Sequence, residues 1–285
     1  MNVQIIVDSG TDLPKAYYNE LSIEMVPLTV YLDEKDYLDQ VDIESKTVYD
    51  AMRDGAAPKT AQPSPESFHE VFKKYADKGK TIIYFGLSSE LSGTYQSATI
   101  AREQILEDYP DADIYTIDTK AASMGYGLIA YHAAKLAHEG ASVQDILDLA
   151  NHYVSHMEHI FTVDDLEYLQ RGGRVSRTQA FVGSLLKIKP LLHVEEGKLV
   201  PLEKIRGAKK VLRRMVDLAK ERGEDFNQQT LAITHGDDEE NAQKLAELLR
   251  DELQPKDIII YPIGSAIGAH AGPGTIALFF LSKTE

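Results

Sequence analysis

The stretch TIIYFGLSSELSGTYQSA, residues 81–98, decides the fold prediction. Its first residues, 81–85, form a short apolar run that predicts a buried strand. Ala98, Ala101 and Ile105 then recur at helical spacing. The loop between them places hydroxyls and free backbone N–H groups where the strand ends and the helix starts, and such a point suits an anion. Because this loop carries no positive charge, we expect a carboxylate held by neutral hydrogen bonds.

Ser92, in the middle of this loop, has a simpler alternative role. Serine is common at the start of a helix, where its hydroxyl accepts a hydrogen bond from a backbone N–H group. The residues alone therefore leave both helix capping and ligand binding open for Ser92.

Strand and helix patterns alternate through the first half of the chain. Residues 3–7 and 23–31 are expected to form strands, and a capping-box pattern starts a helix at Ser142. Repeated strand–helix units predict a mainly parallel sheet covered by helices. We therefore expect an N-terminal α/β domain over residues 1–156.

The second half mixes hairpins with helices. Two apolar runs, 189–194 and 198–202, flank Glu195-Glu196-Gly197, which is typical of a β-hairpin. The pattern predicts an α+β domain with a mixed or antiparallel sheet over residues 157–285. The overall fold class is thus α/β in two domains, and a junction between abutting domains is a common ligand site.

Composition excludes several classes of function. The chain has no cysteine, which excludes disulfides and thiolate chemistry, and its net charge of −15 argues against binding to nucleic acid. No signal-peptide pattern or membrane-length apolar run is present, so we expect a soluble cytoplasmic protein. Residues 171–214 differ, with twelve Lys or Arg against three acids. This net-basic segment predicts a docking surface for a negatively charged partner.

Polar clusters interrupt the apolar patterning at five places, and clusters that follow parallel strands gather where ligands bind. These clusters are residues 8–14, 60–64, 87–98, 169–174 and 268–274. No phosphate-binding loop, dinucleotide fingerprint or nucleophile elbow is present.

Two chemical alternatives remain on residue types alone. A Ser92–His270 dyad with Asp8 or Asp118 as its orienting acid would make a hydrolase. His152, His156 and His159 have helical spacing, but no carboxylate completes a metal-binding pattern, so surface histidines and no metal are expected.

The chain resembles the DegV family over nearly its whole length. The matching strings are DSGTDLP, TAQPS, LSSELSGTYQSA, IDTKAASMGYG, YLQRGGRVS, KPLLHVEEGKLVP, IRGAKK and IGAHAGPGT, in this order. Members of this family are known as fatty-acid-binding proteins, and some are the acyl-carrier subunits of bacterial fatty acid kinases. The resemblance implies a two-domain protein that buries an acyl chain and holds its carboxylate at the domain junction.

The resemblance also implies roles for individual residues. It places the carboxylate against Thr60, Ser92 and His270, and it assigns work with the kinase to Arg174 and Arg206. The neighbouring positions of the same loops are Ser89, Gly93, Thr94 and Gly268. Ala61 and Gly10 depart from the serines usual in the family, which leaves the lipid preference open without removing a carboxylate contact.

The function implied is that of a non-catalytic subunit. It would bind a long-chain fatty acid and need no cofactor. It would present the carboxylate to the catalytic subunit of a fatty acid kinase, which forms the acyl phosphate as a step toward phospholipid synthesis. A lipid-transfer protein with transient contact to anionic membranes, and the Ser92/His270 hydrolase, are the alternatives.

Overall fold

The apolar run at residues 81–85 forms β6 (Thr81–Gly86), all six residues of which are buried. In this computed structural model, which describes residues 2–176 and 188–283, β6 lies inside a parallel four-stranded sheet of order β2-β1-β6-β7. The other strands are β1 (Val3–Asp8), β2 (Glu24–Val26) and β7 (Ile114–Asp118). Parallel strands buried on both faces require helices on both sides, and the chain supplies them.

Helices α3 (Pro65–Ala76) and α4 (Thr94–Asp108) cover one face of this sheet, where Phe68 and Phe72 pack against Tyr84 of β6. The helices α1 (Lys15–Glu20), α5 (Met124–Glu139) and α6 (Val143–His156) lie on the other side. The predicted capping box is present, since Ser142 and Asp145 bond each other's backbone N–H groups at the start of α6.

The second half forms a six-stranded sheet of order β10-β9-β8-β13-β11-β12. Its strands are β8 (Met157–Thr162), β9 (Ile188–Glu195), β10 (Lys198–Arg206), β11 (Thr230–His235), β12 (Asp257–Pro262) and β13 (Ile276–Leu281). Among these strands only β11 and β12 pair in parallel, which confirms the predicted mixed sheet. The antiparallel pairing of β9 with β10 confirms the predicted hairpin.

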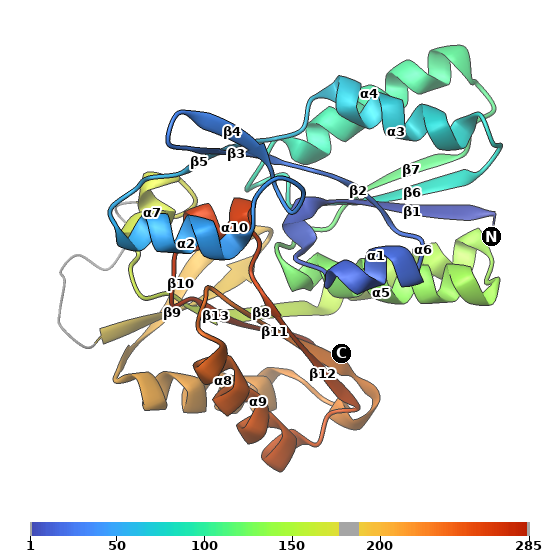
Figure 1. Cartoon of the computed structure of the whole chain (residues 1–285). Coiled ribbons are helices and arrows are strands. Elements are labelled where there is room, and N and C mark those ends of the chain that lie inside the picture. The colour runs from blue at the N-terminus through green and yellow to red at the C-terminus, as the bar shows by residue number, and fades with distance from the viewer. Residues whose placement is uncertain (1, 177–187, 284–285) are drawn as a thin grey trace.

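Helices α8 (Ala208–Arg222) and α9 (Glu239–Leu253) cover the outer face of the six-stranded sheet, and α5 packs between the two sheets. The molecule therefore alternates layers of helix and sheet from α3 and α4 down to α8 and α9 (Figure 1). The carboxyl ends of the parallel strands and the start of α5 meet the inner face of the second sheet.

The expectation of one strand over residues 23–31 is wrong. The chain leaves the first sheet after β2 at Pro27, which has no N–H group to continue a ladder, and enters a separate three-stranded sheet of order β4-β3-β5. Its strands are β3 (Thr29–Leu32), β4 (Lys35–Leu38) and β5 (Lys59–Ala61). The short helices α2 (Ser45–Arg53), α7 (Glu167–Arg171) and α10 (Ser265–Ala271) lie near this sheet (Figure 1).

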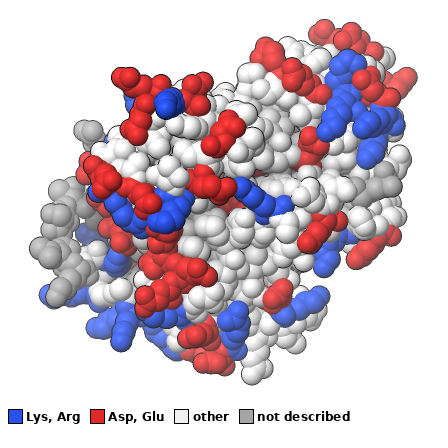
Figure 2. All heavy atoms as spheres, viewed as in Figure 1, with Lys and Arg blue, Asp and Glu red and all other residues white. Residues whose placement is uncertain are grey.

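Charge is unevenly distributed over the surface. Figure 2 shows Asp and Glu side chains spread over most of one face, with Lys and Arg gathered mainly at the upper right and lower left.

Part of the basic segment, including Arg177, lies outside the described residues. Within residues 2–176 and 188–283, no helix is long and apolar enough to cross a membrane.

Candidate functional site

An apolar cavity lies where the two sheets face each other, beside the small sheet and α10. The space free of protein atoms is ≈ 800 Å³, a figure that includes open solvent at the mouth of the cavity. Aliphatic and aromatic side chains form most of its wall. They are Leu28, Leu87, Leu91, Phe161, Leu169, Val194, Leu199, Ile263, Ile267 and Phe279.

Thr60 reaches this cavity because of its register in the small sheet. It lies directly opposite Val30 in β3, and Val30 is fully buried. Residues paired across a ladder share a face, so the Thr60 side chain points inward. Its hydroxyl oxygen lies 2.7 Å from Nε2 of His270, in a hydrogen bond whose direction depends on the imidazole tautomer.

His270 occupies the last turn of α10 and lines the same part of the cavity. Gly172 packs against its other ring nitrogen so closely that any side chain at this position would overlap Nδ1. Burial, together with the positive charge of Arg174, lowers the pKa of His270 to about 4. The imidazole is therefore neutral at pH 7 and offers either one donor or one acceptor at Nε2.

Ser92 lines the cavity and also hydrogen-bonds Thr94, the first residue of α4. Its hydroxyl oxygen lies 2.8 Å from Oγ1 of Thr94 and accepts a hydrogen bond from the Thr94 N–H group at 3.3 Å. The helical residues begin at Thr94, with Gly93 before them. Gly93 is the N-cap residue and no side chain caps α4, so the predicted capping role of Ser92 is wrong. The Ser92 hydroxyl instead bonds the first helical residue from the loop and lines the cavity.

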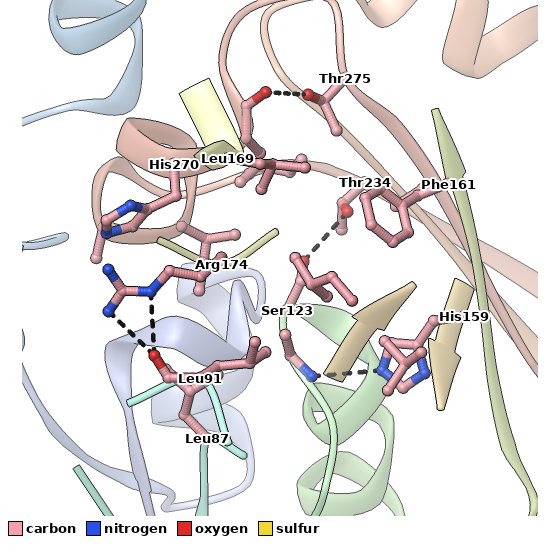
Figure 3. Close-up of a pocket in the computed structure, with 18 of the residues that line it drawn as sticks. Leu87, Leu91, Ser123, His159, Phe161, Leu169, Arg174, Thr234, His270 and Thr275 are labelled. Carbon is pink, nitrogen blue, oxygen red and sulfur yellow. Dashed lines mark hydrogen bonds between the residues drawn. The ribbon is translucent and has the colours of Figure 1, made fainter. Parts of the chain in front are cut away.

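Arg174 changes the expected chemistry of the site. Its Nε and Nη2 donate to the carbonyl oxygen of Leu91 at 3.1 and 3.0 Å, and its Nη1 donates to the carbonyl of Gly172 at 2.5 Å. The guanidinium lies near His270 at one end of the cavity, while Phe161 and His159 lie at the other (Figure 3). The expected neutral donors therefore share the cavity wall with a guanidinium.

The end of the cavity near Arg174 contains a positively charged guanidinium. All hydrogen bonds given above for Arg174 go to backbone carbonyls, and burial alone lowers the pKa of its guanidinium. A guanidinium that is not matched by a carboxylate favours an anion beside it. Thr60 bonds His270, which lies near Arg174 (Figure 3), and Ser92 directly follows Leu91, whose carbonyl accepts from the guanidinium.

The remaining predicted residues do not line the cavity. Ser89 is exposed and bonds the carboxylate of Asp118, and Gly93 packs against Gln62. Gly268 is part of α10, where it allows close approach of Tyr49. Thr94 is buried behind Ser92.

Arg206 is exposed at the end of β10, away from the cavity wall. Its neighbours Arg213 and Arg214 in the basic segment pair with Glu252 and with Glu203 and Glu221. Acids on the same surface therefore neutralise part of the local excess of positive charge. The exposed side chain of Arg206 is accessible to a partner.

Four polar wall residues were not among the predicted site residues, namely Ser123, His159, Thr234 and Thr275. Ser123 donates to Asp12 at 2.5 Å and lies 3.2 Å from the hydroxyl of Thr234. His159 is 3% exposed, accepts a hydrogen bond from the Ala122 N–H group, and has its pKa lowered to about 4 by burial. The TKAAS loop after β7 was a signal for Ser123, whereas His159 sits in a strand with no distinguishing pattern.

The hydrolase geometry is not formed. His270 bonds Thr60 and Ser92 bonds Thr94, while Asp8 accepts from Tyr84 and Tyr126 rather than from an imidazole. The three histidines of the 152–159 segment also diverge, since His152 and His156 stack on the surface and His159 enters the cavity wall. No group of three potential metal ligands exists in the described part of the chain.

The architecture defines an α/β protein of two stacked sheets with an apolar cavity between them. The DegV family model matches residues 2–283, and this chain belongs to the DegV family. A DegV domain-containing protein of Clostridium perfringens is 43% identical over 284 residues, which cover 99% of this chain and 98% of that one.

Solved structures of the family share the whole fold. A DegV family protein from Thermus thermophilus, described as binding fatty acid, superposes with a TM-score of 0.91 at 31% identity over 99% of this chain and 100% of that one. The fatty acid binding protein DegV from Bacillus subtilis has a TM-score of 0.85 at 32% identity, with the same shares covered. A stearic-acid-binding protein from Eubacterium ventriosum has a TM-score of 0.89 at 28% identity, covering 99% and 98%.

Proposed function

We propose that this protein binds one long-chain fatty acid in the cavity between its sheets, with the carboxylate at Thr60, Ser92 and His270. The observation that carries the proposal is that all three side chains line one largely apolar cavity together with Arg174. Thr60 bonds His270, which lies near Arg174 at one end of the cavity (Figure 3). Structures of related DegV proteins described as fatty-acid-binding support the same ligand class.

The energetics favour an amphipathic ligand. Burial of an acyl chain gains roughly 0.8 kcal/mol per methylene, so about fifteen methylenes give on the order of 12 kcal/mol before the cost of ordering the chain. A buried carboxylate would offset this gain unless it were hydrogen-bonded. The hydroxyls of Thr60 and Ser92, the imidazole of His270 and the nearby guanidinium supply those bonds.

A comparison of ligands with matched chains tests this assignment. Palmitic acid and its methyl ester share the same tail, but only the acid has a carboxylate. We expect the acid to bind at least about tenfold more tightly, because charge-assisted hydrogen bonds contribute more than neutral ones. Equal dissociation constants would reject a carboxylate site at this end of the cavity.

We further propose that the bound carboxylate is presented to the catalytic subunit of a fatty acid kinase, with Arg206 and Arg174 at the docking side. Arg206 is exposed, and the Ser92–His270 pair that a hydrolase would need is not formed, because His270 bonds Thr60 and Ser92 bonds Thr94. Arg206→Ala should leave fatty acid binding unchanged and lower kinase-dependent acyl-phosphate formation, most strongly at low salt. Turnover equal to that of wild type across a salt series would reject this docking role.

A further inference from the structure

The segment Asp8-Ser9-Gly10-Thr11-Asp12, directly after β1, is a polar cluster that the proposed function does not use. Its position at the carboxyl end of a parallel strand predicts ligand contact, yet none of its residues lines the cavity. All five residues are buried. Their hydrogen bonds, rather than a ligand, explain what they do.

Asp12 connects two separate walls of the cavity. Its Oδ1 accepts the backbone N–H of Gly264 at 2.8 Å, and its Oδ2 accepts the hydroxyl of Ser123 at 2.5 Å. Gly264 directly precedes α10, and Ser123 lines the cavity. Asp12 itself is 1% exposed and has a left-handed backbone conformation with φ 52°.

Asp39 makes the adjoining contact from the small sheet. It follows β4, is fully buried, and accepts the backbone N–H of Ser265 at 3.0 Å through Oδ1. Ser9 holds the same region together, because its hydroxyl accepts the N–H of Leu28 at 3.0 Å. Its carbonyl accepts the side-chain amide of Gln40 at 2.6 Å.

The two carboxyl groups thus bond consecutive N–H groups at the start of α10. Such groups have no partner within a helix and must find one elsewhere. A helix of seven residues has little stability of its own, so its position depends on these outside contacts. Tyr49 of α2 adds a hydrogen bond to the Ile263 carbonyl at 3.1 Å, just before the helix.

The position of α10 matters because it builds much of the cavity wall. The helix contributes Ala266, Ile267, His270 and Ala271 to the lining. The hydrogen bond between His270 and Thr60 joins its far end to the small sheet, so a shift at Gly264 would move both the apolar wall and the imidazole.

We propose that Asp12 and Asp39 are positioning residues. They fix the start of α10 and thereby keep the side chains of His270 and Ile267 at their positions in the cavity wall. The ligand part of this inference rests on the proposed function. Burial raises the pKa of Asp12, and it raises that of Asp39 to about 6, so these carboxyl groups are kept here at an electrostatic cost. The titratable groups around them include Asp8, Tyr18, Tyr49 and Tyr126.

Paired substitutions test the role. Asp12→Ala and Asp39→Ala remove the acceptor, whereas Asp12→Asn and Asp39→Asn keep an Oδ1 that can accept the same N–H. With palmitic acid as the probe, we expect each alanine variant to bind about tenfold more weakly and each asparagine variant to stay within about threefold of wild type. The imidazole NMR signals of His270 should shift in the alanine variants even without ligand.

A control separates positioning from general stability. Asp238 also accepts a backbone N–H at a helix start, that of Asn241 in α9, but it lies away from the cavity. Asp238→Ala should lower the melting temperature and leave palmitate affinity unchanged. Folded Asp12→Ala and Asp39→Ala variants with wild-type affinity and unshifted His270 signals would overturn the proposal.

Hydrogen exchange gives a test that needs no variant. In the wild-type protein the amide hydrogens of Gly264 and Ser265 should exchange slowly, because buried carboxyl groups hold them. Rapid exchange of both would overturn the proposal even if the alanine variants failed to fold. Failure of wild-type protein to bind palmitate would instead reject the proposed function, while the His270 signals and the exchange rates would still report on α10.

Discussion

Replacement of Arg174 by alanine separates a role in the cavity from a role only in docking. The side chain makes three hydrogen bonds, two to the Leu91 carbonyl and one to the Gly172 carbonyl. These bonds connect the loop after α7 to the serine loop next to Ser92. Arg174→Ala would leave both carbonyls short of a donor in a half-buried region.

The magnitude follows from those bonds. A buried polar group left without its partner costs about 1–3 kcal/mol, so two carbonyls give a loss of about 3 kcal/mol in the free energy of unfolding after allowance for access of water. For a chain of this size that is a fall of roughly 6 °C in the melting temperature. Loss of the positive charge should also weaken fatty acid binding about tenfold.

Calorimetry for the melting temperature and a palmitate titration below that temperature provide the measurements. Arg174→Lys is the matched variant, because it keeps the charge but cannot bond the Leu91 carbonyl through two nitrogens. It should recover most of the affinity and little of the stability. A wild-type melting temperature together with a wild-type dissociation constant for Arg174→Ala would refute this reasoning and leave docking as the only role for Arg174.

Three further outcomes are expected. Ser92→Ala should weaken fatty acid binding by roughly 1–3 kcal/mol in calorimetric titration. An unchanged dissociation constant in a folded variant would show that Ser92 acts only through its hydrogen bonds to Thr94 at the start of α4. His159 is protonated only near pH 4 in the fold but at pH 6.5 when unfolded, so stability that is complete at pH 7 should fall by about 3 kcal/mol toward pH 4. In the His159→Phe variant, the free energy of unfolding measured with urea should fall less between pH 7 and pH 4 than in wild type. The same pH dependence in both proteins would contradict this role of His159. Gly172→Ala should displace His270 and weaken binding about tenfold, and the same affinity as wild type would show that the imidazole is not needed at its present position.

Local patterns were enough for much of the fold. The strand β6 and the start of α6 lie where the local patterns place them. The hairpin of β9 and β10 has its turn at the predicted Glu196 and Gly197, both with positive φ. These features depend on neighbours in the sequence. The domain boundary at residue 156 stays a prediction, since α5 packs on both sheets.

The small sheet could not be predicted in the same way. β4 has the sequence KDYL, which lacks an apolar run, and its turn with β3 uses Asp33 and Glu34 in left-handed conformations. Such turns usually contain Gly or Asn, so the hairpin signal was missing. Without this sheet, the inward orientation of Thr60 in β5 could not be derived.

The candidate site depended on a resemblance and on long-range contacts. Thr60, Ser92 and His270 come from β5, the loop before α4 and α10, and the structure brings these distant segments to one cavity. Arg174 was expected on the surface because it belongs to a net-basic segment. Two backbone carbonyls instead hold its guanidinium against the cavity, and no local pattern reveals such partners.

Native mass spectrometry of gently purified protein, with identification of the extracted lipid, tests the central claim most directly. We expect a protein mass increased by one long-chain fatty acid, and an increase of the same kind when delipidated protein is given palmitic acid. A bare polypeptide mass in both experiments would contradict the account.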